Sequence, residues 1–241
     1  MRAMLDPQRK RPVPDEPPLC NGDRMKQPEF HRRYEAYPDH VKIELIGGTV
    51  YMASPLRRPH AQDDEELGYA LAVYRRGTPG TERLPNATAI LGEESEPQPD
   101  QALRILPEYG GQSWETEDNY LQGPPELLAE IAYSTRALDL HQKRTDYDAA
   151  GVVEYLVLCV EERELHWFNF KLRRLLKPDA QGIYRSRVFP GLWIDGPALL
   201  ARDSARIEEV VRQGLASPEH AAFVKRLQAA YQKRQRRRRS T

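Results

Sequence analysis

Apolar and polar positions follow two different periods in the first half of the chain, and these periods predict its first elements. Residues 41–46 and 49–54 are strand-like and flank Gly47 and Gly48, a pair that tolerates positive φ, so they predict a β-hairpin. Apolar residues between Pro59 and Arg76 recur at helical spacing, which predicts an amphipathic helix that ends at Gly77. We also expect a short helix over residues 29–36 and strands around residues 81–91 and 98–106.

The second half opens with a strand, a helix and another strand. Residues 127–132 form a short apolar run suited to a buried strand, and residues 136–150 are helical up to Gly151, which favours a helix end. A second apolar strand follows over residues 153–160. Strands joined through a helix favour parallel pairing with a right-handed crossover. The polar, Gly-rich residues 107–123 before this unit are expected to form a loop.

The C-terminal third adds strands and then helices. A hairpin-like segment covers residues 164–177, and short strand-like pieces at 183–189 and 191–194 extend the sheet or pack near it. Residues 198–215 and 217–234 predict helices, the second with Ser217 as N-cap. The whole pattern predicts an α/β protein, with a mixed β-sheet flanked by helices and a C-terminal helical extension.

Length and composition are consistent with one domain that carries extensions at both ends. A chain of 241 residues is long enough for one sizeable α/β core and too short for two. Residues 1–28 contain six prolines and few apolar side chains, so we expect an N-terminal arm there. We expect the main domain over residues 29–196, followed by C-terminal helices and a basic tail over residues 197–241.

No segment of the sequence marks the chain for a membrane or for export. The longest apolar stretches are strand-sized and fall well short of the ~20 residues that cross a bilayer. The basic N-terminus lacks the apolar core of a secretory signal. Cys20 and Cys159 form neither a disulfide framework nor a paired metal motif. We therefore expect a soluble, cytoplasmic protein without a membrane partner.

The charge is unevenly distributed, although the 36 basic and 36 acidic residues balance. Residues 221–241 contain eight Lys and Arg and no acid, so the first 220 residues carry about −8. Phosphate neutralisation by basic side chains supplies most of the affinity for nucleic acid. Contact with DNA is therefore expected to be local, through the basic tail Arg234–Arg239, or assisted by a metal ion.

Two acids in strand-like contexts are the leading candidates for chemistry. Asp100 opens the strand predicted around residues 98–106, and Glu130 interrupts an apolar strand, where a buried acid needs a cation or a basic partner. If the two strands are neighbours, both carboxylates can bind a hard divalent cation such as Mg²⁺ or Mn²⁺. Lys143 on the next helix would then stabilise charge on a phosphate or orient the attacking water. This set suits metal-assisted phosphodiester cleavage.

Several short motifs occur in a characteristic order between Glu29 and Trp167. They are IELIGGTVYMASP followed by His60, then Gln98-Pro99-Asp100, then LLAEIA with Glu130, and then the spaced residues Asp139, Lys143, Tyr147, Gly151, Glu154 and Tyr155. In this order and spacing, the chain resembles the Uma-type (Uma-two) family of restriction endonucleases, a branch of the PD-(D/E)XK nuclease superfamily. The resemblance implies a restriction-endonuclease-like fold and Mg²⁺-dependent cleavage of DNA.

The chain departs from the superfamily pattern two residues after Glu130, where a lysine is usual and Ala132 stands instead. The resemblance implies that Lys143 replaces this lysine. Asp139, Lys143 and Tyr147 are four residues apart and form one helix stripe that could line the site. Two plainer interpretations stay open, because Lys143 also fits a surface ion pair with Asp139 and Tyr147 also fits core packing.

Three further residues are candidates for a supporting shell. The resemblance implies that Glu44 faces the metal, through water or directly, and that His60 contacts phosphate. Gln98 is expected to share a strand face with Asp100 and to wall the site. As alternatives, Glu44 and His60 fit solvated surface positions.

The sequence leaves three functions open. The first is a Mg²⁺-dependent endodeoxyribonuclease with Asp100, Glu130 and Lys143 as catalytic residues, in which paired cuts of duplex DNA call for a homodimer. The second is an inactive nuclease-fold protein that serves as a binding or assembly module, consistent with Ala132 and the acidic body. The third is a nuclease that selects RNA or a branched structure.

Overall fold

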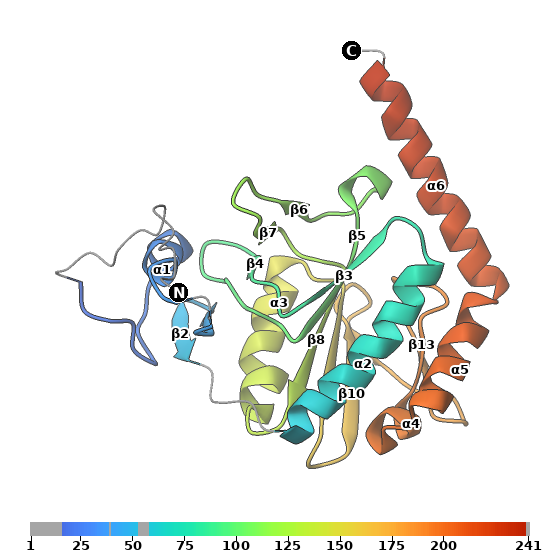
Figure 1. Ribbon diagram of the computed structural model, residues 1–241, viewed down its shortest axis with the longest axis horizontal. Helices are drawn as coiled ribbons and strands as arrows, with labels where there is room; N and C mark the ends of the chain where they lie inside the picture. Colours follow the sequence, from blue (N-terminus) through green and yellow to red (C-terminus); the bar gives the residue numbers. More distant parts are fainter. Residues whose placement is uncertain (1–15, 39, 53–57, 240–241) are drawn as a thin grey trace, which may run out of the picture.

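The structure is a computed structural model that describes residues 16–38, 40–52 and 58–239. Its centre is a six-stranded mixed sheet with the strand order β11-β10-β9-β8-β5-β3 (Figure 1). Only β8 and β9 pair in parallel, as predicted, and the other neighbours in this sheet are antiparallel. In sheet order, the strands are β11 (Arg174–Leu176), β10 (Glu164–Asn169), β9 (Glu154–Cys159), β8 (Leu127–Ala132), β5 (Gln101–Ile105) and β3 (Thr81–Pro85).

Three small sheets surround the central one. The predicted hairpin is present as β1 (Ile43–Ile46) and β2 (Thr49–Met52), and both turn glycines have positive φ, +55° and +73°. The strands β12 (Ile183–Arg185) and β13 (Trp193–Asp195) pair with each other instead of extending the central sheet.

The segment 107–123, predicted as a loop, contains regular structure. It holds a 3₁₀ turn, η1 (Pro107–Tyr109), and two short strands, β6 (Trp114–Glu115) and β7 (Leu121–Gln122). These strands form a third small sheet with β4 (Ala89–Ile90). Strands of two residues are too short to leave a period in the sequence, which is why the pattern did not predict them.

Helices cover both faces of the central sheet. On one face, α2 (Arg58–Gly77), α4 (Gly196–Ala201) and α5 (Ser204–Leu215) enclose an apolar core with Leu103, Ile131 and Leu156. On the other face, residues 138–150 pack over a second core that includes Leu128, Ala132 and Tyr155. Helix α1 (Gln27–Tyr34) lies beside the β1–β2 hairpin (Figure 1).

The helix between β8 and β9 has two parts. Leu138–Lys143 (η2) is a π-helix, and Arg144–Ala150 (α3) continues it as an α-helix that ends at Gly151 with φ +94°. The predicted span 136–150 is therefore helical, but its first part is wider than a regular α-helix. Turns of π-helix are rare and are frequent at functional sites.

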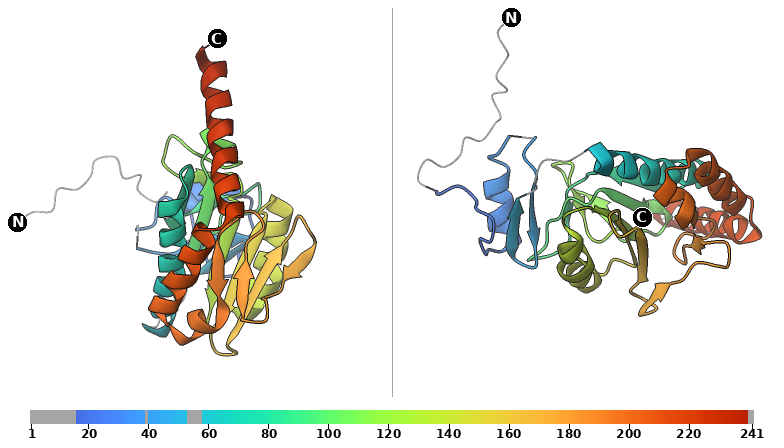
Figure 2. Two further views of the ribbon diagram at one scale, coloured as in Figure 1. Left: turned by 90° about the vertical axis from the view of Figure 1, so that its right-hand side faces the viewer. Right: turned by 90° about the horizontal axis from the view of Figure 1, so that it is seen from below.

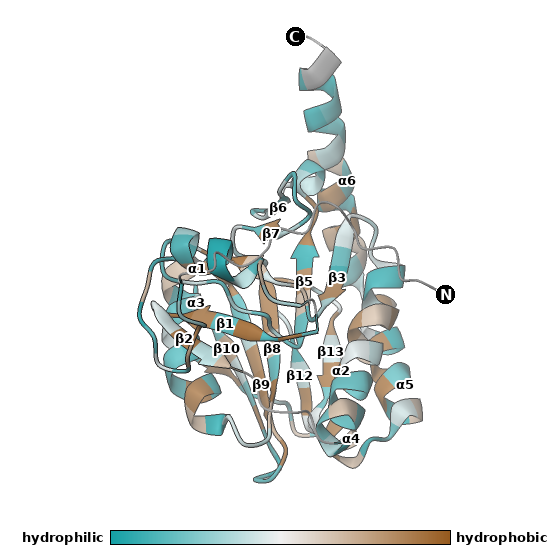
Figure 3. Cartoon of the chain, turned by 60° about the vertical axis from the view of Figure 1, so that its left-hand side comes forward, coloured by the Kyte–Doolittle hydropathy of each residue, from teal (hydrophilic) through white to brown (hydrophobic). Residues whose placement is uncertain are grey.

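The C-terminal helices differ from the prediction in one place. The predicted helix 198–215 is broken at Arg202, which has φ +57°, and α5 begins after Asp203, whose carboxylate accepts a hydrogen bond from Arg206 N. Helix α6 (Pro218–Arg239) follows, and Ser217 caps it by accepting a hydrogen bond from His220 N at 3.2 Å. The C-terminal turns of α6 extend beyond the body of the protein and are polar (Figures 2 and 3).

Some of the predictions fall outside the described residues. Residues 1–15 of the predicted arm and residues 53–55 of the motif IELIGGTVYMASP are among them. Within the described ranges, none of the helices combines the length and the apolar composition needed to span a bilayer.

Candidate active site

Asp100 and Glu130 are brought side by side by the pairing of β5 with β8. Gln101 lies opposite Ala129 at the start of this antiparallel pair, and Asp100 and Glu130 are the next residues beyond it on the two segments. Asp100 Oδ2 accepts a hydrogen bond from Ile131 N at 2.8 Å, which fixes the carboxylate against β8. Residues opposite each other on antiparallel strands share one face of the sheet. The two acids therefore lie on the same face, under η2 and α3.

Lys143 reaches the same place from η2. Its Nζ lies 2.9 Å from Glu130 Oε1, 3.1 Å from Glu44 Oε2 and 3.8 Å from Asp139 Oδ1. The side chain is buried, so the alternative of a surface ion pair with Asp139 is wrong. Burial alone would lower the pKa of Lys143, but the three carboxylates raise it well above its ordinary value. The amine is therefore a charged ammonium that donates hydrogen bonds.

Glu44 enters the site from the β1–β2 hairpin. Its Oε1 accepts a hydrogen bond from Gln98 N at 2.7 Å, and Leu45 exchanges two backbone hydrogen bonds with Glu96. These contacts attach the hairpin to the segment before β5, on the side of the sheet that carries α3 (Figure 3). Glu44 is buried, which contradicts its interpretation as a solvated strand acid.

Gln98 contributes in a different way from the one predicted. Strand β5 begins at Gln101, so Gln98 does not belong to the strand that follows Asp100. Its backbone N–H holds Glu44, while its side-chain Nε2 lies 3.5 Å from Thr88 Oγ1. The prediction that Gln98 shares a strand face with Asp100 is wrong, because β5 begins only after both residues, at Gln101.

Tyr147 and Asp139 complete the stripe on η2 and α3. The Tyr147 hydroxyl donates a hydrogen bond to Glu130 Oε1 at 2.8 Å, the same oxygen that Lys143 contacts. Asp139 accepts a hydrogen bond from the Thr135 hydroxyl, and its carbonyl accepts one from the Tyr155 hydroxyl at 3.1 Å. The three predicted stripe residues therefore face the two strands, and Tyr147 contacts Glu130 directly as well as packing in the core.

His60 and Lys42 flank the other acid. His60 Nε2 lies 3.4 Å from Asp100 Oδ2, and Lys42 Nζ lies 3.9 Å from Oδ1. Burial alone would raise the pKa of Asp100, but His60 and Lys42 hold it below its ordinary value. Sequence reasoning missed Lys42, although within the predicted strand 41–46 it precedes Glu44 by two residues and would share its face.

The site has an excess of negative charge. Burial raises the pKa of Glu130 to about 8, and Lys143 opposes this shift while Asp100, Asp139 and Glu44 add to it. Three carboxylates thus surround one buried ammonium, and Asp100, flanked by His60 and Lys42, adds a fourth negative charge that acts on Glu130. A bound cation would relieve this repulsion.

The donor chemistry fits a hard divalent cation. Carboxylate oxygens are the ligands that Mg²⁺ prefers, and it is usually bound through one or two carboxylates with several waters. Among the described residues, no group of three or more His, Cys, Asp or Glu side chains is arranged to hold a metal ion. The adjacent pair Asp100 and Glu130 matches the two-carboxylate pattern.

A protein-family model matches most of the chain. Residues 28–199 match the model of the Uma2 family, described as "Putative restriction endonuclease". The chain belongs to the Uma2 family. The Uma2 match includes every predicted site residue and ends within α4, so α5 and α6 lie outside it. The resemblance predicted from the sequence motifs is confirmed.

Comparison with solved structures supports the fold. The chain is similar to the crystal structure of "a putative nuclease belonging to DUF820 from Anabaena variabilis ATCC 29413", with a TM-score of 0.54 and 14% sequence identity. The similarity covers 70% of this chain and 96% of that one. The predicted fold class, a restriction-endonuclease-like mixed sheet flanked by helices, is confirmed. The comparison with curated proteins gives no match.

Proposed function

We propose that this Uma2 protein is a Mg²⁺-dependent endonuclease that hydrolyses phosphodiester bonds of DNA. The observation that carries the proposal is the adjacency of Asp100 and Glu130 on one sheet face, with the Lys143 ammonium 2.9 Å from Glu130. Membership of the Uma2 family, with its description as an endonuclease family, supports the reaction class.

Asp100 and Glu130 would hold the cation, Mg²⁺ or Mn²⁺. When bound, the metal would polarise a phosphoryl oxygen and lower the pKa of a bound water. In the hydrolysis itself, water adds to phosphorus, one P–O ester bond breaks, and the leaving oxygen takes up a proton.

The side chains around the two acids orient the reacting groups and neutralise their charge. Lys143 is charged, so it donates hydrogen bonds to the attacking water or to the phosphate and stabilises the charge that develops there. Glu44 and Asp139 fix the ammonium from two other sides. The Tyr147 hydroxyl keeps Glu130 in place, and His60 does the same for Asp100 from the other edge.

Helix α6 is the proposed contact to the DNA backbone outside the site. The ring of Tyr231 stacks on Tyr109 with centroids 4.8 Å apart, and Arg234 Nη1 donates a hydrogen bond to Pro107 O. These contacts attach α6 to the body, and the helix continues into the basic run that ends at Arg239. A local basic segment fits a protein whose body is acidic. A homodimer would bring two active sites to the duplex, one for each strand of a paired cut.

The test is cleavage of supercoiled plasmid by the purified full chain with Mg²⁺ or Mn²⁺. Wild type is expected to nick and linearise the plasmid, and the double variant Asp100→Asn, Glu130→Gln is expected to lose this activity. The matched control is Asp118→Asn, Glu161→Gln, which also removes two acids, both from exposed positions. Equal cleavage by wild type and the site variant would reject the proposal, and faster cleavage of RNA or branched DNA would reassign the substrate.

Ala132 favours a second candidate, a nuclease-fold protein that binds without cutting. It occupies the position at which the superfamily usually has its lysine, and it is buried in the apolar core on the site face. Calorimetry with Mn²⁺ separates the candidates. Metal uptake that the double variant loses supports the nuclease, and a folded protein that takes up no Mn²⁺ supports the binding module.

A further inference from the structure

Four basic side chains lie together where α3 meets the hairpin of β10 and β11, and we call them the basic patch. Arg144 begins α3, Lys171 and Arg173 lie in the hairpin turn, and Arg174 begins β11. Arg144, Arg173 and Arg174 line a hollow of about 330 Å³. Neither the proposed chemistry nor the contacts of α6 involve this patch.

The basic patch lies on the same face of the central sheet as the two acids. Glu130 is opposite Val157 of β9, and Val157 is opposite His166 of β10. Phe168 follows His166 by two residues, so it shares this face and forms part of the hollow. At about 4.8 Å per strand, β10 is ~10 Å from β8. This part of the sheet is open, since Leu175, opposite Phe168 on β11, is 45% exposed.

The helix formed by η2 and α3 lies between the site and the patch. Lys143 Nζ is 2.9 Å from Glu130, whereas the guanidinium of the next residue, Arg144, lies over the ring of Phe168, 5.3 Å from its centroid. An aromatic ring attracts a cation above its face, which favours this position of Arg144. Successive residues of one helix therefore supply a cation to the site and a cation to the patch.

Most of the cations in the patch have no acceptor within the protein. In the part of the chain that the structure describes, the side chains of Arg144, Lys171 and Arg174 make no hydrogen bond or ion pair. Lys171 and Arg174 are exposed, Arg144 is half-buried, and none of the three has a buried side-chain nitrogen without a partner. Their N–H groups therefore face solvent and can reach a ligand in the hollow.

Arg173 is held in place by the turn and by the one acid of the hollow. Its Nη1 lies 2.6 Å from Asp148 Oδ2, and its backbone N donates a hydrogen bond to Phe170 O at 3.2 Å. Its φ of +53° is in the left-handed region, where glycine would be free of strain. Such strain is often retained where a side chain has a function.

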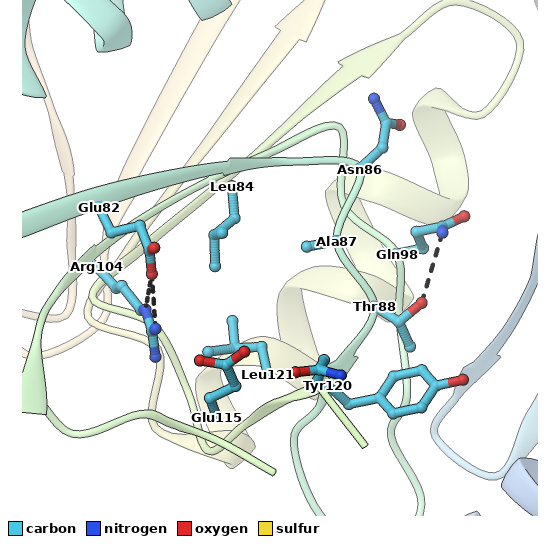
Figure 4. A pocket seen from close by; sticks show the side chains of 11 residues that line it. Glu82, Leu84, Asn86, Ala87, Thr88, Gln98, Arg104, Glu115, Tyr120 and Leu121 are labelled. Atoms are coloured by element: carbon cyan, nitrogen blue, oxygen red, sulfur yellow. Dashed lines mark hydrogen bonds and ion pairs between the residues drawn. The ribbon is translucent and has the colours of Figure 1, made fainter. Parts of the chain in front are cut away.

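A second polar pocket, between β3, β5 and the small sheet of β4, β7 and β6, differs in charge (Figure 4). Its cation, Arg104, is only 7% exposed and pairs with Glu82 at 2.6 Å. Glu115 adds a negative charge to the lining. An anion would therefore be repelled there, whereas the basic patch has four cations and one acid.

The chemistry of the basic patch suits phosphate groups. The guanidinium group has five N–H donors in a planar fork that matches the oxygens of a phosphate. The rest of the protein is different, because residues 1–220 as a whole carry about −8. A partner drawn to this surface by charge is therefore an anion with several negative groups.

We propose that the basic patch binds the sugar-phosphate backbone of DNA beside the strand that is held at the site. The shared sheet face and the ~10 Å between β8 and β10 favour DNA over an acidic protein, since a duplex carries one charge for about every 1.7 Å of its axis. The choice of DNA rests on the proposed nuclease function. The binding itself requires neither metal nor cleavage.

The experiment measures how the affinity of the full chain for a fluorescent 20-base-pair duplex depends on salt, by anisotropy without divalent cations. The variant Arg144→Gln, Arg174→Gln removes two cations of the patch. We expect it to bind about tenfold more weakly at 0.1 M salt, and the slope of log affinity against log salt concentration to fall in magnitude by about 2. An affinity and a slope equal to those of wild type would overturn the proposal.

Two further variants make the test specific. Arg144→Lys, Arg174→Lys keeps both charges, so it is expected to keep the wild-type slope. Arg75→Gln, Arg76→Gln removes two exposed cations from the last turn of α2, on the other face of the sheet, and is also expected to bind like wild type. A slope that falls equally in the lysine variant or in the α2 variant would overturn the proposal.

A poly-glutamate peptide tests the alternative of an acidic protein partner. We expect a 20-residue peptide to compete much less well than DNA of the same total charge. Equal competition by the peptide, lost in Arg144→Gln, Arg174→Gln, would overturn the proposal and assign the patch to an acidic protein.

The outcome is independent of the cleavage assay. A protein that cuts no DNA but binds it through Arg144 and Arg174 keeps the patch and loses the nuclease assignment. A protein that cuts DNA with an unchanged salt slope in the patch variant keeps the nuclease and loses the patch.

Discussion

The Lys143 ammonium lies 2.9 Å from Glu130 Oε1. Lys143 belongs to the helix η2, which follows the strand that carries Glu130. The position two residues after Glu130, which shares its face of β8, is Ala132, and it is buried in the apolar core with Leu140. A lysine at 132 would have to displace this packing. The helix that covers Ala132 therefore supplies the amine itself.

Replacement of Lys143 by methionine should strongly slow cleavage and weaken the fold. The change keeps an unbranched side chain but leaves Glu44, Glu130 and Asp139 without their shared cation. We expect cleavage to fall by roughly 10²-fold or more, the typical cost of losing one positioned donor. We also expect the thermal midpoint to fall, since removing one partner of a buried charge cluster costs about 3–5 kcal/mol.

Plasmid cleavage and thermal denaturation measure the two effects of Lys143→Met. The exposed Lys171 provides the control, because Lys171→Met removes the same charge from the surface. A Lys143→Met protein that cuts at the wild-type rate would exclude this lysine from the chemistry.

Removal of the Tyr147 hydroxyl should weaken metal binding more than it weakens the fold. Tyr147→Phe keeps the ring that packs edge-on against Tyr155, but it removes the hydrogen bond to Glu130. We expect a stability loss of about 1 kcal/mol and a Mn²⁺ affinity about tenfold lower, as for other residues that orient metal ligands.

Tyr155→Phe is the matched control for Tyr147→Phe. Its hydroxyl also makes one buried hydrogen bond, to the carbonyl of Asp139, but it does not contact Glu130. The stability loss should be similar and the Mn²⁺ affinity unchanged. If calorimetry gives the two variants the same affinity, Tyr147 only packs in the core.

The acids of the site were predictable from sequence because the residues directly around them indicate their role. Glu130 interrupts an otherwise apolar strand, and the run 127–132 matches the observed β8 residue for residue. The spacing of Asp139, Lys143 and Tyr147 also defined the stripe that faces β8. The π-helical turn within that stripe was not predictable, because π turns are rare and a spacing of four residues indicates an ordinary α-helix.

The remaining parts of the site depend on pairings between distant segments. Glu44 lies 54 residues before Gln98, whose N–H holds it, and a short hairpin carries no signal for the place where it will dock. Such relationships arise from tertiary packing alone.

The raised pKa of Glu130 predicts how stability changes with pH in the absence of divalent cations. The unfolded carboxyl loses its proton near its ordinary pKa of 4.5, whereas the folded one keeps it up to about 8. Between these values the unfolded state releases a proton that the folded state retains, so this group lowers the stability as the pH rises. Above about pH 8 the loss is complete.

Glu130→Gln should remove this contribution. We expect the variant to be more stable than wild type at pH 8, by on the order of a few kcal/mol, with a smaller difference at pH 5. Mg²⁺ should raise the thermal midpoint of wild type and leave that of the variant unchanged, because the cation competes with the proton for Glu130. A difference between the two proteins that is the same at both pH values would contradict the assigned pKa.

The basic end of α6 should control DNA affinity and its dependence on salt without affecting the chemical step. Residues 233–239 contain six Lys and Arg. Each phosphate that a protein neutralises contributes about −0.9 to the slope of log affinity against log salt concentration.

Truncation after Gln232 should therefore reduce the magnitude of this slope by up to about 5, measured by fluorescence anisotropy on a duplex. The triple variant Arg234→Gln, Arg236→Gln, Arg237→Gln, which keeps the helix length, should give about half that change. Cleavage at saturating DNA should stay at the wild-type rate in both, because Lys143 of η2 and the two acids that it covers lie in the body of the protein. An unchanged salt slope after truncation would show that DNA contacts the body, and a lost rate at saturation would place the helix in the chemistry.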